Sequence, residues 1–233
     1  MANAGRLVVC GTPIGNLEDL TFRVAGALKG AQMVLAEDTR RARQLLSHLG
    51  VRVKVLSFNE HNAASRLAQV MDLLEAGLVV ALVSDAGMPC ISDPGAVLVE
   101  RCHVLGIPVT VLPGPSAVTT ALAWSGLTVR EFTFAGFPPR KSGERRRFFR
   151  KLWEEGRVAV VFEAVHRVDK TLEDLGTELG PLPVIIAREM TKVHEEVLRG
   201  TPAELVLQLR GKERQRGEFT IILDLRRKKE HRL

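Results

Sequence analysis

Short apolar runs alternate with helical patterns along the first half of the chain, and this alternation constrains the fold more than any other feature. The apolar runs have the length of strands and stand at 6–10, 33–36, 53–57, 78–83 and 107–112. The stretches between them carry apolar residues at helical spacing and stand at 20–28, 39–49, 62–76 and 96–105. Strands that alternate with helices predict a mostly parallel sheet with helices packed against it.

The second half of the chain also mixes the two kinds of element. Strands are predicted at 132–137, 158–162, 184–187 and 219–225, and a helix at 167–179. The run Pro113-Gly114-Pro115 separates the two halves and is the strongest break in the chain. We therefore expect two α/β domains, at 1–113 and 114–225, followed by a disordered basic tail at 226–233.

Composition narrows the classes of protein that fit. No apolar run is long enough to span a membrane, and no secretory leader opens the chain, so we expect a soluble protein that stays in the cytoplasm. The odd count of three cysteines, without C-x-x-C spacing, argues against a disulfide framework and against a metal site. A net charge of +6 favours an anionic partner such as nucleic acid, although a protein that is merely basic fits the charge as well.

Turn-rich loops follow three of the predicted strands, where open α/β sheets bind their ligands. They are Gly11–Asn16, Ser84–Pro89 and Pro113–Ala117. The first matches neither G-x-G-x-x-G nor a P-loop, which weakens the dinucleotide and nucleotide interpretations. In the third, Ser116 would cap a helix whose free N–H groups suit a carboxylate. Plain turns and an interdomain hinge are the alternatives.

Charged residues directly follow other strands. Glu37-Asp38-Thr39-Arg40 and Glu60-His61 are expected at one edge of the first sheet. A network of helix caps is the alternative for Asp38 and for Asn62, which is expected to cap the helix that follows it. In the second half, the charged segments 162–167 and 188–196 also directly follow predicted strands. They are candidates for the lining of a cleft between the domains.

The densest charge cluster lies at 140–151, with seven Lys or Arg and one Glu. Prolines precede it, and Phe148 and Phe149 lie within it. Such a stretch can neutralise phosphates while aromatic rings stack on bases. A solvated basic helix face is the alternative.

Eight short motifs occur in a fixed order along the chain. They are T-P-I-G-N-L at 12–17, A-E-D-T-R at 36–40, E-H-N at 60–62, L-V-S-D-A-G at 82–87, I-S-D-P-G at 91–95, L-P-G-P-S-A at 112–117, P-R-K at 139–141 and R-E-M-T-K-x-H-E-E at 188–196. Each is weak alone, but the ordered set resembles the ribosomal RNA small subunit methyltransferase I family over about residues 7–225.

This resemblance implies a class III, tetrapyrrole-methylase-like methyltransferase: two α/β domains with S-adenosylmethionine in the cleft between them. It implies a homodimer that methylates the 2′-hydroxyl of a cytidine in small-subunit ribosomal RNA, within the assembled small subunit. By motif position, the cofactor-binding residues would be Pro13, Ser84, Asp85, Ala86, Met88, Ser116, Ala117, Phe162, Ala187, Arg188, Phe219 and Thr220.

The chain departs from the family pattern at two of these places. Met88 stands where the family usually has Thr, and F-E-A-V-H-R at 162–167 replaces F-Y-E-x-P-H-R. These departures affect side-chain details of the cofactor pocket rather than the cofactor itself, because backbone and packing contacts survive such substitutions.

A ribose hydroxyl is a poor nucleophile, so a general base could assist it. The candidate catalytic residues are Glu60, His61, Asp38 and Glu189. The candidate RNA-binding residues are Arg40, Arg140, Lys141, Arg145, Arg146, Arg147 and Arg150. The alternatives are an enzyme of the same fold that acts on a small molecule or a protein, and a non-catalytic RNA-binding assembly factor. The long basic stretch argues against the first, and the intact loops argue against the second.

Overall fold

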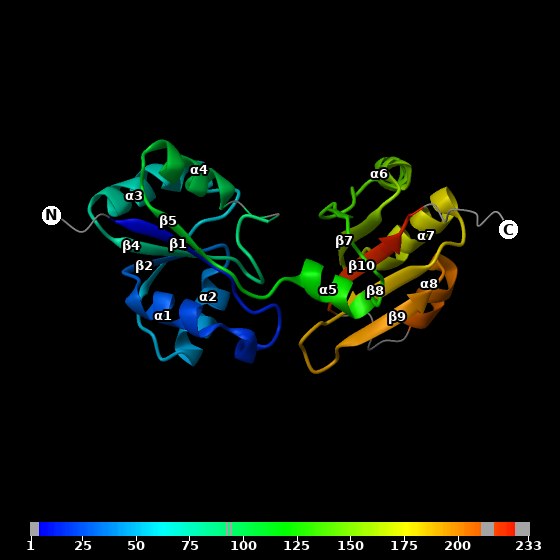
Figure 1. Ribbon diagram of the computed structural model, residues 1–233, viewed down its shortest axis with the longest axis horizontal. Helices are drawn as coiled ribbons and strands as arrows, with labels where there is room; N and C mark the ends of the chain where they lie inside the picture. The colour runs from blue at the N-terminus through cyan, green and yellow to red at the C-terminus, as the bar shows by residue number, and fades with distance from the viewer. Residues whose placement is uncertain (1–4, 92, 94, 211–216, 227–233) are drawn as a thin grey trace. The chain divides into compact units, whose positions relative to one another are not determined.

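The computed structural model describes residues 5–91, 93, 95–210 and 217–226. The chain divides into two compact units, Met1–Ser116 and Ala117–Leu233. The sequence had placed the boundary at residue 113, within the Pro113-Gly114-Pro115 run. Figure 1 colours the first unit from blue to green and the second from green to red.

The first unit contains a five-stranded sheet in the order β3-β2-β4-β1-β5. Every neighbouring pair is parallel, which confirms the predicted α/β class. The strands are β1 (Arg6–Cys10), β2 (Met33–Ala36), β3 (Lys54–Ser57), β4 (Val79–Val83) and β5 (Val109–Leu112).

Helices cover both faces of this sheet (Figure 1). Helices α1 (Phe22–Gly30) and α2 (Thr39–His48) pack against one face, and α3 (Ala63–Glu75) and α4 (Ala96–Val104) against the other. Alternate residues of β4 therefore enter different core clusters. Because both faces are buried, β4 is apolar at every position, as strands in parallel sheets commonly are.

Polar side chains before α1 and α3 have different roles at the starts of these helices. Thr21 accepts a hydrogen bond from the amide of Val24 (3.2 Å) and caps α1. Asn62, expected from the sequence to cap α3, instead accepts from the amide of Asn59 behind it (2.8 Å). The Asn62 side chain therefore orders the loop after β3 rather than the first turn of the helix.

The second unit has a mixed five-stranded sheet in the order β6-β7-β10-β8-β9. In it β6 and β7 are parallel, and the other neighbouring pairs are antiparallel. The strands are β6 (Phe132–Phe134), β7 (Val158–Ala164), β8 (Val184–Arg188), β9 (Glu196–Gly200) and β10 (Glu218–Asp224).

Helices α6 (Ser142–Glu155), α7 (Val168–Leu179) and α8 (Pro202–Leu209) share one core cluster with one face of this sheet. Helix α5 (Ala117–Ser125) contacts β8 and β10 and lies on the other side in Figure 1. Strand residues therefore alternate between two environments, as the two-residue period of a strand requires.

Candidate active site

The loops after β1, β4 and β5 are joined into one cluster at the carboxyl edge of the first sheet. The amide of Thr12 donates to the carbonyl of Gly87 (2.9 Å), and the amide of Gly87 donates back to Thr12 (3.1 Å). The Thr12 hydroxyl donates to the carbonyl of Ser84 (3.2 Å). The amide of Gly11 donates to the carbonyl of Leu112 (3.1 Å), which brings in the end of β5.

Glycine is required where two of these loops touch. A Cβ atom on Gly11 would lie 2.7 Å from the Cα of Gly114 and 2.7 Å from the sulfur of Met88. The first and third loops therefore meet backbone to backbone. Met88, one of the departures from the family pattern, packs against this contact rather than away from it.

Carboxylates line the same edge beyond β4, where β2 and β3 end. Asp85 accepts from the amide of Asp38 (3.0 Å) and lies 3.7 Å from the Arg41 guanidinium. Desolvation, and then the charge of Asp85, raises the pKa of Glu37. The charges of Asp93 and Glu60 raise it further. Burial also raises the pKa of Asp93 itself.

The structure separates the roles of the catalytic candidates in this unit. Hydrogen bonds from Arg40 lower the pKa of Asp38 to about 2, so Asp38 is a weak base that caps α2. Glu60 and His61 are exposed in the turn after β3. Glu37 was missing from the expected catalytic set, although its raised pKa makes it a stronger candidate base than Asp38. Its position directly after β2 was the available sequence signal.

Glu189, the fourth catalytic candidate, belongs to the second unit and organises the loop after β8. Its carboxylate accepts from Lys192 (2.8 Å) and from the amide of Glu218 (2.9 Å). Burial raises the pKa of Glu189, but these hydrogen bonds outweigh burial and lower it overall. Its backbone is left-handed (φ +50°), as is that of Thr191 (φ +66°). Glu189 therefore has a structural part in holding a strained loop.

Two faces of the second sheet carry the cofactor-binding residues expected there. Thr220 pairs with Phe162 on β7 and with Ala187 on β8, so these three side chains share one face. Arg188 and Phe219 alternate to the opposite face, where the Arg188 guanidinium lies 5.9 Å from the Phe219 ring. A ligand on the face of Thr220 could therefore meet Arg188 and Phe219 only through their backbones, and the expected cofactor role of all five residues stays a prediction.

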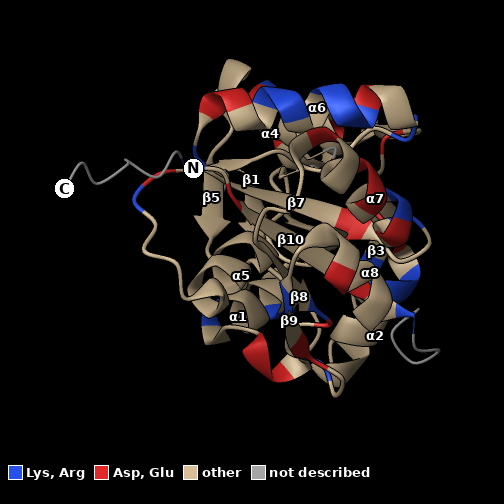
Figure 2. Cartoon of the chain, turned by 90° about the vertical axis from the view of Figure 1, so that its right-hand side faces the viewer, with Lys and Arg blue, Asp and Glu red and all other residues tan. Residues whose placement is uncertain are grey.

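The basic helix is less available to RNA than the sequence suggested. Figure 2 shows basic residues along α6, with acidic residues at both of its ends and on α7. Arg145 is buried and ion-pairs with Asp174 on α7, and Arg150 lies 2.6 Å from Glu178. Phe149 is buried in the core. Burial of Arg145 and Phe149 corrects the expectation that they bind RNA, whereas the side chain of Arg150 is 61% exposed and its RNA-binding role stays a prediction.

The remaining basic residues face solvent. Arg146 is half-buried and 3.7 Å from Asp174, whereas Arg40, Arg140, Lys141 and Arg147 are exposed. Arg226, from the predicted tail, pairs with Asp224 (2.7 Å), and 227–233 lie outside the described residues.

Comparison with known proteins identifies the family of this chain. Residues 6–206 match the model of the Tetrapyrrole (Corrin/Porphyrin) Methylases. A protein of Thermotoga maritima named Ribosomal RNA small subunit methyltransferase I is 47% identical over 94% of this chain and 98% of its own length. The chain belongs to the ribosomal RNA small subunit methyltransferase I family. A relative of the same name from Xylella fastidiosa is 45% identical over 96% of this chain and 82% of its own length.

Solved structures show the same fold at lower identity. A cobalt precorrin-4 methyltransferase aligns with a TM-score of 0.70 and 16% identity over 94% of this chain and 95% of its own. Diphthine synthase aligns with a TM-score of 0.73 and 14% identity over 94% of this chain and 89% of its own. These likenesses establish the tetrapyrrole methylase fold for the chain and leave its substrate to other observations.

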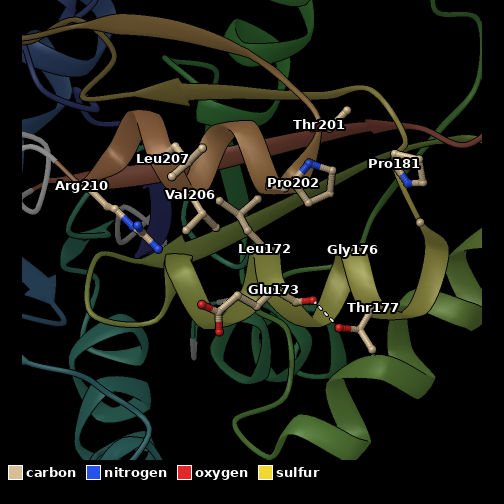
Figure 3. A pocket seen from close by; sticks show the side chains of 12 residues that line it. Leu172, Glu173, Gly176, Thr177, Pro181, Thr201, Pro202, Val206, Leu207 and Arg210 are labelled. Carbon is tan, nitrogen blue, oxygen red and sulfur yellow. Dashed lines mark hydrogen bonds between the residues drawn. The ribbon is translucent and has the colours of Figure 1, made fainter.

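One groove of this methyltransferase lies away from the candidate site residues. It has a volume of about 650 Å³, lies between α7 and α8, and is lined by residues such as Leu172, Pro202 and Leu207 (Figure 3). No expected site residue lines it. Within the described ranges, no helix is long and apolar enough to cross a membrane, and no cluster of three or more His, Cys, Asp or Glu could hold a metal ion.

Proposed function

We propose that this protein transfers the methyl group of S-adenosylmethionine to the 2′-hydroxyl of a cytidine ribose in small-subunit ribosomal RNA. The observation that carries the proposal is the 47% identity to a named small-subunit methyltransferase across nearly the whole of both chains. We place the reaction in the cytoplasm, on the assembled small subunit, and the active form as a homodimer. These finer statements follow from the family and from the RNA substrate.

The residues of the first unit fit a cofactor with a positively charged centre. S-Adenosylmethionine supplies a methyl group activated by a sulfonium and also carries an ammonium group and ribose hydroxyls. Burial is the first cause of the raised pKa values of Glu37 and Asp93, and repulsion by the charge of Asp85 raises both further. A cation among them would relieve this repulsion, and carboxylates also accept from hydroxyls. Pro13, Ser84, Ala86, Met88 and Ser116 belong to the loops beside them.

In the second unit, the proposal assigns cofactor contacts to the face shared by Phe162, Ala187 and Thr220. Thr220 and Ala187 are buried, and Phe162 is half-buried, so this face is apolar apart from one hydroxyl. Such a surface suits a flat, largely apolar group with few polar atoms. Ala117, at the start of α5, and the backbones of Arg188 and Phe219 remain proposed contacts.

The chain's own residues then have two tasks. Binding and orientation place the ribose hydroxyl in line with the bond that breaks, which accounts for much of the rate in such displacements. A carboxylate or imidazole takes the hydroxyl proton, and we assign this part to Glu37, Glu60 or His61, ahead of Asp38 and Glu189. The phosphates would be bound by half-buried Arg146 and by the exposed residues Arg40, Arg140, Lys141, Arg147 and Arg150.

The experiment is transfer of tritium from labelled S-adenosylmethionine to undermethylated small subunits, beside protein-free small-subunit RNA. Nucleoside analysis should recover the label as 2′-O-methylcytidine, mainly from the subunit. Label on a base, or none from an enzyme that binds the cofactor, would contradict the RNA assignment and favour a small-molecule or protein substrate. Absence of cofactor binding would favour a non-catalytic assembly factor. Light scattering of the same sample tests the homodimer.

A further inference from the structure

The segment Phe137–Lys141, between β6 and α6, presents an aromatic ring beside two cations. Phe137 is 55% exposed, although its ring packs edge to face against that of Phe162, with 5.7 Å between the ring centroids. Within the segment, Pro138 is buried, whereas Arg140 and Lys141 are exposed. A partly exposed ring followed by two exposed cations is the combination that binds single-stranded nucleic acid.

Two arginines hold the backbone of this segment from below. Arg145 donates to the carbonyl of Pro139 (3.2 Å) and to that of Arg140 (3.0 Å). Arg167 donates to the carbonyl of Pro138 and to that of Pro139 (3.3 Å). Three consecutive carbonyls are therefore satisfied by guanidinium groups rather than by a strand or a helix. The two prolines further restrict the backbone of the segment.

Each of these arginines pairs with a carboxylate: Arg145 through hydrogen bonds, and Arg167 through its charge, since its buried Nε has no hydrogen-bond partner. The Nε of Arg145 donates to Asp174 on α7 (2.8 Å). The Nε of Arg167 lies 3.2 Å from Glu163, whose side chain is wholly buried and also accepts from the Thr171 hydroxyl. Buried ion pairs contribute little net stability but fix one geometry. Two arginine–carboxylate pairs therefore support the backbone of one exposed loop.

We propose that Phe137–Lys141 is a preorganised nucleotide-binding loop, in which Phe137 stacks on an unpaired base while Arg140 and Lys141 bind the flanking phosphates. Arg145 and Arg167 are positioning residues that hold the loop in its binding geometry. The proposal rests on the proposed function for the identity of the partner as RNA. Preorganisation matters because a loop already ordered loses little conformational entropy on binding.

Steady-state kinetics on small ribosomal subunits test the stacking. Phe137→Ala should raise KM about tenfold while kcat stays within about twofold, because stacking contributes to binding. Phe137→Trp, which keeps a flat ring, should restore KM. Trp153→Ala is the matched control, since Trp153 is a 41% exposed aromatic on α6 outside the loop. An unchanged KM for Phe137→Ala, or the same rise in KM for Trp153→Ala, would overturn the stacking role.

A double-mutant cycle tests the positioning. Arg167→Lys keeps the positive charge but loses the forked guanidinium donors, so KM should rise. Adding Phe137→Ala to Arg167→Lys should raise KM by less than the product of the two single effects. Independent effects that multiply would show a structural role only. Arg145→Lys gives the same test from α6, and thermal unfolding of each variant identifies loss of the fold.

Direct binding separates this proposal from the proposed function. The probe is a fluorescein-labelled single-stranded RNA oligonucleotide, followed by anisotropy with the full chain. If wild type transfers no methyl group but Phe137→Ala weakens RNA binding about tenfold, the loop stands and the proposed function fails. If wild type methylates the subunit and Phe137→Ala changes neither KM nor RNA affinity, the loop proposal fails alone. If wild type binds no RNA, the loop proposal falls as well.

Discussion

Thr12 and Gly87 exchange two backbone hydrogen bonds, of 2.9 Å and 3.1 Å, between loops that follow parallel strands. The pair is an isolated antiparallel bridge, so it is not a continuation of the sheet. It requires Gly87 in the left-handed region, at φ +79°, where a side chain is strained. The bridge therefore fixes the loop after β4 against the loop after β1, which is the framework of the proposed cofactor site.

Gly87→Ala should weaken S-adenosylmethionine binding as well as stability. The φ angle alone costs roughly 1–2 kcal/mol for a residue with a Cβ atom. The added Cβ would make only ordinary van der Waals contacts, 3.4 Å from Ile14 and 3.5 Å from the carbonyl of Pro115, so the strain at φ rather than a clash would act on the bridge. Isothermal titration with the cofactor and thermal unfolding followed by circular dichroism measure the two effects.

Gly106→Ala is the matched control for this substitution. Gly106 has a similar φ of +67° but nothing within 4 Å of the added Cβ. It should lose similar stability and keep full cofactor affinity. Equal losses of affinity in both variants would show that the bridge has no special part in binding.

Glu37→Gln should make the cofactor-free protein more stable at neutral pH and weaken its affinity for the cofactor. The pKa of Glu37 is raised, so its ionised form is disfavoured in the fold and the penalty is present above the folded pKa. The penalty disappears as the pH falls below the ordinary pKa of a glutamate, where the two proteins should be equally stable. Thermal unfolding from about pH 3 to about pH 8, which extends to both sides of the ordinary glutamate pKa of about 4.3, measures this convergence.

Activity separates the electrostatic role of Glu37 from a role as base. Loss of kcat in Glu37→Gln, with saturating cofactor, would support proton transfer by Glu37. Loss of cofactor affinity alone would support an electrostatic role for Glu37 beside Asp85 and Asp93. Glu75→Gln, at the exposed end of α3, is the control and should change neither quantity.

The first sheet could be predicted from sequence because its central strands β1, β2 and β4 are buried almost throughout and its helices carry one apolar face. Strand β9 could not, because E-V-L-R-G carries only two apolar residues and lies at the edge of the second sheet. Edge strands depend on pairing with a neighbour, which leaves little local signal. Helix α8 went unpredicted, although Thr201 and Glu204 form a capping box at its start.

The sequence predicted which loops form the site, but it predicted the roles of their side chains less well. Motif order located the turns, because glycine and proline mark them locally. The role of Arg145 depends on the face of α6 that it occupies. Arg145, Phe149 and Leu152 are spaced i, i+4 and i+7, the pattern of a buried stripe, so the basic run concealed a signal that was present. The partners of Asp38 and Glu189 depend on packing that no local pattern encodes.

Asp38→Asn should leave kcat within about twofold of wild type, because a carboxylate with a pKa of about 2 is a poor base at neutral pH. Asparagine caps a helix about as well as aspartate, so α2 should stay formed. The lowered pKa stabilises the fold above the ordinary pKa of an aspartate, and this contribution is lost as the pH falls through about 2. Acid unfolding should show the variant less stable at neutral pH and equal to wild type in strong acid. A large loss of kcat would return Asp38 to the catalytic set.

Asp174→Asn should destabilise the second unit by roughly 3–5 kcal/mol, because it leaves the buried guanidinium of Arg145 without its counter-ion. Glu178→Gln removes the partner of Arg150 from the same pair of helices, but Arg150 is exposed and the loss should stay below about 1 kcal/mol. Both tryptophans, Trp124 and Trp153, lie in the second unit, so urea unfolding followed by their fluorescence reports on that unit alone. A shift in midpoint with an unchanged slope measures stability. Equal losses of stability in the two variants would show that the Arg145–Asp174 pair is solvated like the Arg150–Glu178 pair. Arg145 would then no longer count as a positioning residue for Phe137–Lys141.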